Sequence, residues 1–202
     1  MKSFTSYVNE KLILNKSLIK EKITVSSKSE LKNYIESYIE KTGNEDYINL
    51  NNVDISALKD LTRLFRSYKF KYIVISKWDV SNIENMMFMF PKTLEKVDLS
   101  DWDVSNVQNM DGMFAGCKNL SEIGNISKWD TRSLKSAKSM FEECEKIKEI
   151  DISEWNFKSL VNVTCMFYGC ISLESIGNIP VDLRNISNST NIFLFCKKLK
   201  LQ

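Results

Sequence analysis

The sequence of 202 residues predicts an α/β solenoid of about six strand–helix coils with a helical N-terminal cap. The first observation is a motif that recurs six times, and each copy runs 12 residues from its first residue to a phenylalanine. The second is the spacing of the copies, which start 25, 24, 27, 26 and 26 residues apart. A repeat of this length is typical of solenoids, in which each unit buries its apolar face against its neighbours. The six copies are 53–65, 78–90, 102–114, 129–141, 155–167 and 181–193.

Each copy predicts one short helix, because its apolar residues recur at three- and four-residue spacing. The third copy shows this pattern at Val107, Met110, Met113, Phe114 and Cys117. The aspartate that follows the tryptophan opening a copy, such as Asp103, suits the N-cap of such a helix, and so does the serine two residues later, such as Ser105.

An alternating apolar run follows each of the predicted helices, and alternation is typical of a strand. The runs are 94–100, 120–127, 147–153 and 173–179. Stacked coils would bring these strands together in a parallel sheet. This third observation completes the prediction of one strand and one helix per coil.

The segment 1–48 precedes the repeats and predicts a helical cap, with the solenoid at 49–202 as the second part of the chain. Helices are expected at 3–15 and at about 29–41. Ser27 and Glu30 form a capping-box pattern before the second helix, and Gly43 suits its end. The first coil of a solenoid exposes an apolar end, which this segment would cover.

Three columns of equivalent residues are expected to build the interior. The phenylalanines that end the copies, Phe90, Phe114, Phe141 and Phe167, should be buried and stacked. The tryptophans that open four copies favour a buried stack with indole N–H groups bonded to backbone, and an aromatic platform for bases or sugars is the alternative. Cys117, Cys144, Cys170 and Cys196 form a column of small buried thiols, whereas Cys165 is expected to face outward and react first.

The repeat resembles the BspA-like leucine-rich repeats, also called the mycoplasma lipoprotein-type repeat. The shared pattern is W-D-x-S-N-V-x-N-M-x-x-M-F-x-x-C-x-x-L-x-x-L, which is closest over 78–120 and weakest in the first and last copies. This resemblance implies a right-handed, leucine-rich-repeat-type solenoid. Named members are mostly bacterial surface proteins that bind host or matrix proteins, and similar short forms without signal peptides look common in phage genomes.

Composition argues against several classes of function. The chain has no histidine, no Gly-rich phosphate loop and no CxxC pair, so neither an enzyme nor a cofactor or metal is expected. The net charge of +2 and the acids among the lysines argue against nucleic acid as a partner. The longest apolar run near the N-terminus is Leu12–Leu14, which predicts neither a signal peptide nor a membrane span. We therefore expect a cytoplasmic protein of a bacterial host.

The expected function is non-catalytic protein binding, as a cytosolic scaffold or inhibitor of bacterial or phage origin. A structural or host-contact component of a virion or cell surface is the alternative. The candidate contact residues are Met87, Phe88, Glu122, Glu149, Asp151, Leu199 and Leu201. The first two are apolar where other copies carry polar or small residues, so the N-terminal cap or a partner should cover them. The last two lie at the C-terminal end, where an uncapped coil would permit a homodimer.

Overall fold

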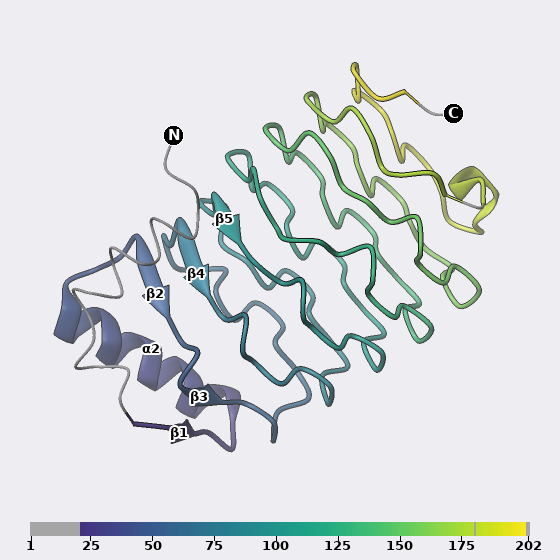
Figure 1. Ribbon diagram of the computed structural model, residues 1–202. Coiled ribbons are helices and arrows are strands. Elements are labelled where there is room, and N and C mark those ends of the chain that lie inside the picture. The colour runs from purple at the N-terminus through teal and green to yellow at the C-terminus, as the bar shows by residue number, and fades with distance from the viewer. Residues whose placement is uncertain (1–20, 180, 201–202) are drawn as a thin grey trace.

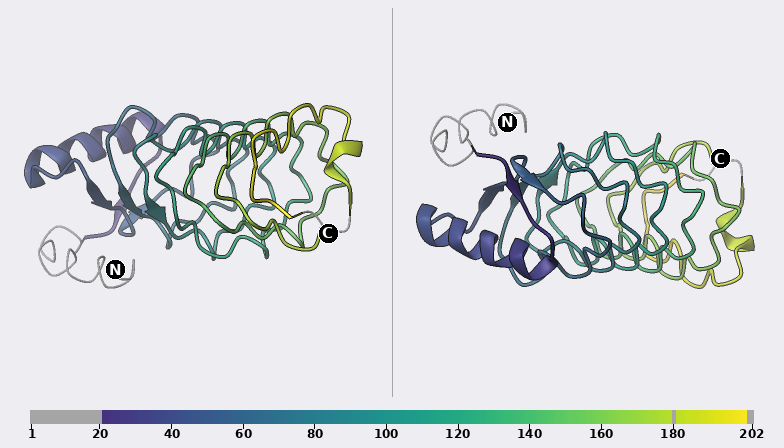
Figure 2. Two further views of the ribbon diagram at one scale, coloured as in Figure 1. Left: turned by 90° about the horizontal axis from the view of Figure 1, so that it is seen from above. Right: turned by 90° about the horizontal axis from the view of Figure 1, so that it is seen from below.

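The repeat copies lie side by side in a stack of coils, where one coil is one copy together with the segment that leads to the next (Figure 1). The computed structural model describes residues 21–179 and 181–200. Helix α2 (Lys28–Thr42) lies at one end of the stack, and residues 181–200 form the other end (Figure 2). The predicted helix at 3–15 lies outside the described residues.

Helix α2 forms where the sequence predicts it. The Ser27 hydroxyl accepts a hydrogen bond from the backbone N–H of Glu30, which satisfies one orphan donor at the helix start. Gly43 adopts the left-handed conformation at φ 60°, and its N–H donates to the Ile39 carbonyl at 2.8 Å. The helix buries Leu31, Ile35 and Tyr38. The division of the chain at residue 48 stays a prediction.

The strands are short and belong to two parallel sheets. β1 (Ile23–Thr24) pairs with β3 (Val53–Asp54). β2 (Tyr47–Asn49) pairs with β4 (Tyr72–Val74), which pairs in turn with β5 (Lys96–Val97). A single 3₁₀ turn, η1 (Leu183–Asn185), belongs to the last described coil. Beyond β5 the strand pairing between described coils is reduced to isolated parallel bridges, such as Glu149 with Ser175.

The predicted right-handed, leucine-rich-repeat-type solenoid of about six strand–helix coils is wrong. The only α-helix in the described part of the chain is α2, and the copies themselves form successive turns. The hydrogen bonds explain the difference. In the third copy the N–H groups of Met110, Gly112 and Phe114 donate to carbonyls of the next copy, at 2.8–2.9 Å. They are therefore not available for the i→i−4 bonds of a helix.

A left-handed residue in every copy also excludes a helix there. Counting the first residue of each copy as position 0, the residue at position 10 has φ between 51° and 58° in all six copies. These residues are Arg63, Phe88, Gly112, Ser139, Cys165 and Asn191. A residue at positive φ interrupts a right-handed helix. Inward residues still recur every third position because the turns close with i→i+3 bonds, such as Met113 N–H to Met110 O.

The predicted strands at 120–127 and 173–179 are interrupted by Gly124 and Gly177, which have φ of 81° and 79°. These glycines also leave room for the previous coil. A Cβ at Gly124 would lie 2.3 Å from Oδ1 of Asp98, and one at Gly177 would lie 2.2 Å from Oδ1 of Asp151. Only glycine fits both the backbone and the contact, so the extended run ends there.

The phenylalanine and tryptophan columns are confirmed, and the thiol column is confirmed for Cys117, Cys144 and Cys170, whereas Cys196 is half-buried. The phenylalanine rings from Phe65 to Phe193 stack with centroids 4.9–6.1 Å apart, and all but Phe193 are fully buried. The four tryptophans are buried, and each indole N–H donates to a backbone carbonyl 27–30 residues earlier in the chain, as Trp129 does to Leu99 at 3.0 Å. Each column thiol donates to a backbone carbonyl of the preceding coil.

Candidate functional site

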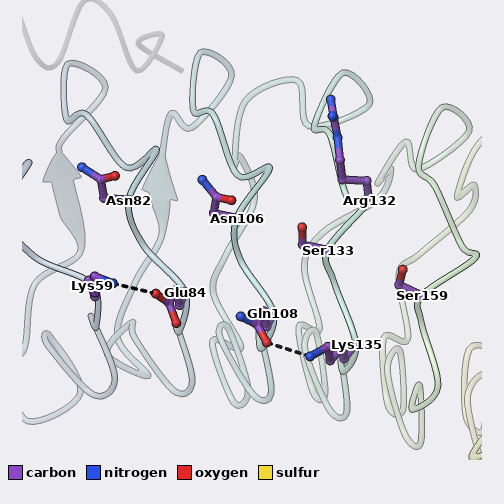
Figure 3. Close-up of a pocket in the computed structure, with 9 residues that line it drawn as sticks. All are labelled: Lys59, Asn82, Glu84, Asn106, Gln108, Arg132, Ser133, Lys135 and Ser159. Atoms are coloured by element: carbon purple, nitrogen blue, oxygen red, sulfur yellow. Dashed lines mark hydrogen bonds and ion pairs between the residues drawn. The ribbon is translucent and has the colours of Figure 1, made fainter.

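An open polar groove of about 590 Å³ crosses five consecutive copies (Figure 3). Its walls come from positions 3, 4 and 6 of the copies, which lie between the tryptophan and the phenylalanine in sequence. The lining residues are Lys59, Asn82, Glu84, Asn106, Gln108, Arg132, Ser133, Lys135 and Ser159. Because equal positions of successive coils lie side by side, one short stretch of the motif supplies the whole surface.

Hydrogen bonds between neighbouring coils hold the groove side chains. Lys59 Nζ lies 3.2 Å from Glu84 Oε1, and Lys135 Nζ lies 2.8 Å from Gln108 Oε1. Asn106 donates from Nδ2 to a backbone carbonyl of the preceding coil at 2.8 Å. These bonds orient the side chains across the coil boundaries. The groove is thus a surface of defined polarity.

The charges in the groove are unequally compensated. Arg132 pairs with Asp130 of its own copy, and its Nε lies 2.6 Å from Oδ2 of that carboxylate. Lys135 bonds a neutral amide, and no carboxylate among the described residues forms an ion pair with it. An exposed cation of this kind retains its attraction for an acidic or carbonyl group of a partner. Lys135 is therefore the strongest attractive charge in the groove.

The predicted pair Met87 and Phe88 is half-buried. The Phe88 ring lies under two guanidinium groups of the first coil, with Arg63 Cζ at 5.4 Å and Arg66 Cζ at 5.5 Å from its centroid. On the other side it packs against Gly112, where a Cβ would come within 2.1 Å of the ring. Residues of the two neighbouring coils thus cover Phe88, and cation–π contacts orient it.

The predicted acidic residues are exposed along the strand side of the coils. Glu122 forms an ion pair with Lys96 at 2.6 Å. Glu149 lies at a backbone bridge to Ser175. The Asp151 carboxylate accepts the backbone N–H of Ser153 at 2.9 Å and lies against Gly177, so it also shapes a turn. The structure does not bring these acids together with Phe88 or with the groove residues, which occupy other stretches of each coil.

At the C-terminal end, Leu199 is half-buried against the core, and Leu201 lies outside the described residues. The residues named from sequence at this end are Leu199 and Leu201, and the structure adds the exposed apolar residues Leu194, Phe195 and Val181. Phe195 is 51% exposed and meets Tyr168 edge to face at 5.3 Å. Phe195 occupies position 14 of its coil, where the three preceding coils have Gly116, Glu143 and Gly169. This contrast in sequence is the signal that could have identified Phe195.

The groove residues were also missed from sequence. Their signal is variation at equal positions, because position 6 reads Lys59, Glu84, Gln108 and Lys135 while the interior columns stay constant. The four residues differ in charge, and a surface on which successive copies place different side chains is available for recognition. The polar candidates named from sequence were Glu122, Glu149 and Asp151, and position 6 was not among them.

No group of three or more His, Cys, Asp or Glu side chains suited to a metal ion occurs within 21–179 and 181–200. None of the helices in these ranges has the length and apolar character needed to cross a membrane. The buried thiols of Cys117 and Cys144 are chemically quiet, because burial raises the pKa of Cys117 to about 12 and raises that of Cys144 well above its ordinary value.

Comparison with known proteins identifies a family. The family described as Mycoplasma protein of unknown function, DUF285, matches residues 33–123 and 92–202. These overlapping matches include all six copies. No curated protein and no solved structure matches the chain. Because the family match extends over more than half of the residues of this chain, the chain belongs to the DUF285 family of Mycoplasma proteins.

Proposed function

We propose that the chain is a non-catalytic protein-binding module that contacts its partner through the polar groove. One observation carries the proposal: a phenylalanine column that repeats in every coil supports side chains that vary at equal positions of the groove. Stacked repeats generally bind partners with such continuous surfaces, because several copies contribute neighbouring side chains. Lys135, which lacks a carboxylate partner among the described residues, favours a partner with acidic groups.

The resemblance to BspA-like repeats supports protein binding over other functions. Within that class, we favour a scaffold or inhibitor that acts in the cytoplasm of a bacterial host, of bacterial or phage origin. A structural or host-contact component of a virion or cell surface is the second version. Cell fractionation separates the two, since the protein is expected in cleared lysate in the first and in envelope or purified particles in the second.

A photo-cross-linker in the groove tests the proposal. Gln108→p-benzoylphenylalanine, made in cells of the source organism, should give one discrete protein adduct on irradiation. Adding Lys135→Glu should reduce the adduct strongly, because it reverses the charge that attracts an acidic partner. Lys146→Glu makes the same charge change on an exposed side chain outside the groove and should leave the adduct unchanged. Absence of an adduct, or equal loss with both variants, would contradict the groove as the contact surface.

A further inference from the structure

Adjacent coils are joined by a regular ladder of backbone hydrogen bonds. In the fourth copy the N–H groups of Ala137, Ser139 and Phe141 donate to Asn162, Thr164 and Met166 of the fifth copy, at 2.8–2.9 Å. These donors occupy positions 8, 10 and 12, and the acceptors occupy positions 7, 9 and 11. The same pairing joins every copy from the first to the fifth to the copy that follows it. From the third copy onward, position 14 adds a fourth bond, as Gly116 N–H does to Glu142 O at 2.7 Å.

The C-terminal coil, residues 181–200, ends this ladder. Its donors at positions 8, 10, 12 and 14 are the N–H groups of Ser189, Asn191, Phe193 and Phe195. Among the described residues none of these four N–H groups has a hydrogen-bond acceptor. The Phe193 ring stacks on Phe167 at 5.7 Å on one face, and the described chain supplies no ring for its other face. The coil thus presents donors at alternate residues beside an uncovered aromatic ring.

The opposite end of the stack is closed. The equivalent acceptor edge of the first coil includes the Thr62 carbonyl, which accepts Lys28 Nζ at 3.2 Å, while the same ammonium pairs with Asp60. Strand β1 pairs with β3, and α2 covers the apolar side of that coil (Figure 2). A second copy of the chain therefore cannot place its N-terminal edge on the C-terminal coil without displacing these residues.

Ion pairs between coils add a preference for charge. Lys118, at position 16 of the third coil, lies 2.8 Å from Glu145 and 3.6 Å from Glu143 of the fourth coil. Lys197 occupies position 16 of the C-terminal coil and is exposed. Glu143 and Glu145 follow Phe141 by two and four positions. A segment that continued the ladder would bring acidic residues to Lys197 if those residues followed its own aromatic residue at the same spacing.

We propose that the C-terminal coil binds a segment of a partner protein that adopts the turns of a repeat copy and presents backbone carbonyls at alternate residues. An aromatic side chain of the segment stacks on Phe193, and acidic residues after it pair with Lys197. The principle is that of strand addition, because main-chain hydrogen bonds supply affinity and side chains supply specificity. A symmetric end-to-end homodimer fits less well, because it sets two rows of donors against each other. The proposal shares with the proposed function only the premise that the partner is a protein.

A peptide with the sequence of residues 129–146 and Cys144→Ser is the probe, because this segment already occupies the required place over Lys118. Titration of the full chain, followed by amide NMR and hydrogen exchange, should shift and protect the amides at 189, 191, 193 and 195. Phe193→Ala should weaken binding about tenfold or more, as truncation of an aromatic anchor does. A peptide of scrambled order should not bind, and Lys135→Glu in the groove should leave binding unchanged.

A charge exchange keeps the proposal testable if Phe193→Ala disturbs the coil. Lys197→Glu should weaken binding of the original peptide and restore it when Glu143 and Glu145 of the peptide are replaced by lysine. Absence of amide shifts at millimolar peptide, shifts confined to the groove, or failure of the exchanged pair would overturn the proposal. Protection of these amides in a concentration-dependent dimer without peptide would overturn it in favour of a second copy. The cross-linker tests the groove separately.

Discussion

Replacement of Phe114 by alanine probes the column that holds the coils together. The Phe114 ring is fully buried between Phe90, at 4.9 Å and 8°, and Phe141, at 5.3 Å and 6°. Its backbone N–H donates to the Met140 carbonyl at 2.9 Å. The substitution removes the ring and leaves the backbone ladder on both sides in place.

The expected loss of stability lies in the upper part of the usual range. Truncation of a buried phenylalanine to alanine costs about 3–5 kcal/mol. Two stacked faces are lost here, each worth about 0.5–1.5 kcal/mol beyond buried area. The ladder bonds keep the neighbouring coils at their spacing, so the cavity cannot close well, and we expect about 4–5 kcal/mol. Phe193→Ala is the matched control, because its ring is half-buried and stacked on one face, and should cost about 1–2 kcal/mol.

Urea unfolding followed by tryptophan fluorescence and circular dichroism measures both variants. With a slope of about 2–3 kcal/mol per molar urea, the midpoint of Phe114→Ala should fall by about 2 M, provided that the two probes give coincident transitions. A midpoint shift for Phe114→Ala no larger than that for Phe193→Ala would refute the reasoning. It would mean that the column relaxes around the missing ring, or that its stacking adds little to stability.

Three further predictions concern a glycine, an acid and the thiols. Gly124→Ala should destabilise the chain by about 2–3 kcal/mol in thermal unfolding, because the backbone of Gly124 has φ 81° and the new Cβ would clash with the Asp98 side chain. Gly43→Ala is the control, because the space around Gly43 is open, and should cost only about 1 kcal/mol. Partial burial raises the pKa of Asp60, but hydrogen bonds from Lys28 and Thr62 outweigh it and lower the pKa overall. Stability from this shift is present above about pH 4 and is lost as the pH falls below it, so Asp60→Asn should show a smaller drop in unfolding midpoint between pH 7 and pH 3; an equal drop would contradict the assignment. Half-buried Cys165 and Cys196 should react first with a thiol reagent at pH 8, while the three buried thiols should react only on unfolding; five fast thiols would contradict the buried column.

The interior columns were readable from sequence because they depend on residue type at fixed spacing. Trp78, Phe90 and Cys117 belong to sets that repeat at equal positions, and a set of large apolar residues in register has to be buried in any stack of similar units. Helix α2 was readable for a local reason, since Ser27, Glu30 and Gly43 act on the backbone within one or two turns of the helix.

The conformation of the copies was not readable in the same way. Inward residues every third or fourth position satisfy both a helix and a series of turns with i→i+3 bonds, so Met110, Met113 and Phe114 fit either. The groove depends on lateral contact as well. Lys59 and Glu84 are 25 residues apart in sequence, and only the stacking of coils brings their side chains together.

The sequence by itself determined which residues are buried, where α2 begins and ends, and how many copies stack, because each depends on spacing within the chain. The tertiary structure decided where the N–H groups of Met110, Gly112 and Phe114 donate, and hence that each copy forms turns and not a helix. The physical reason is competition for backbone donors. A bond to the next coil and a bond four residues back use the same N–H, and the positive φ at position 10 favours the bond to the neighbour.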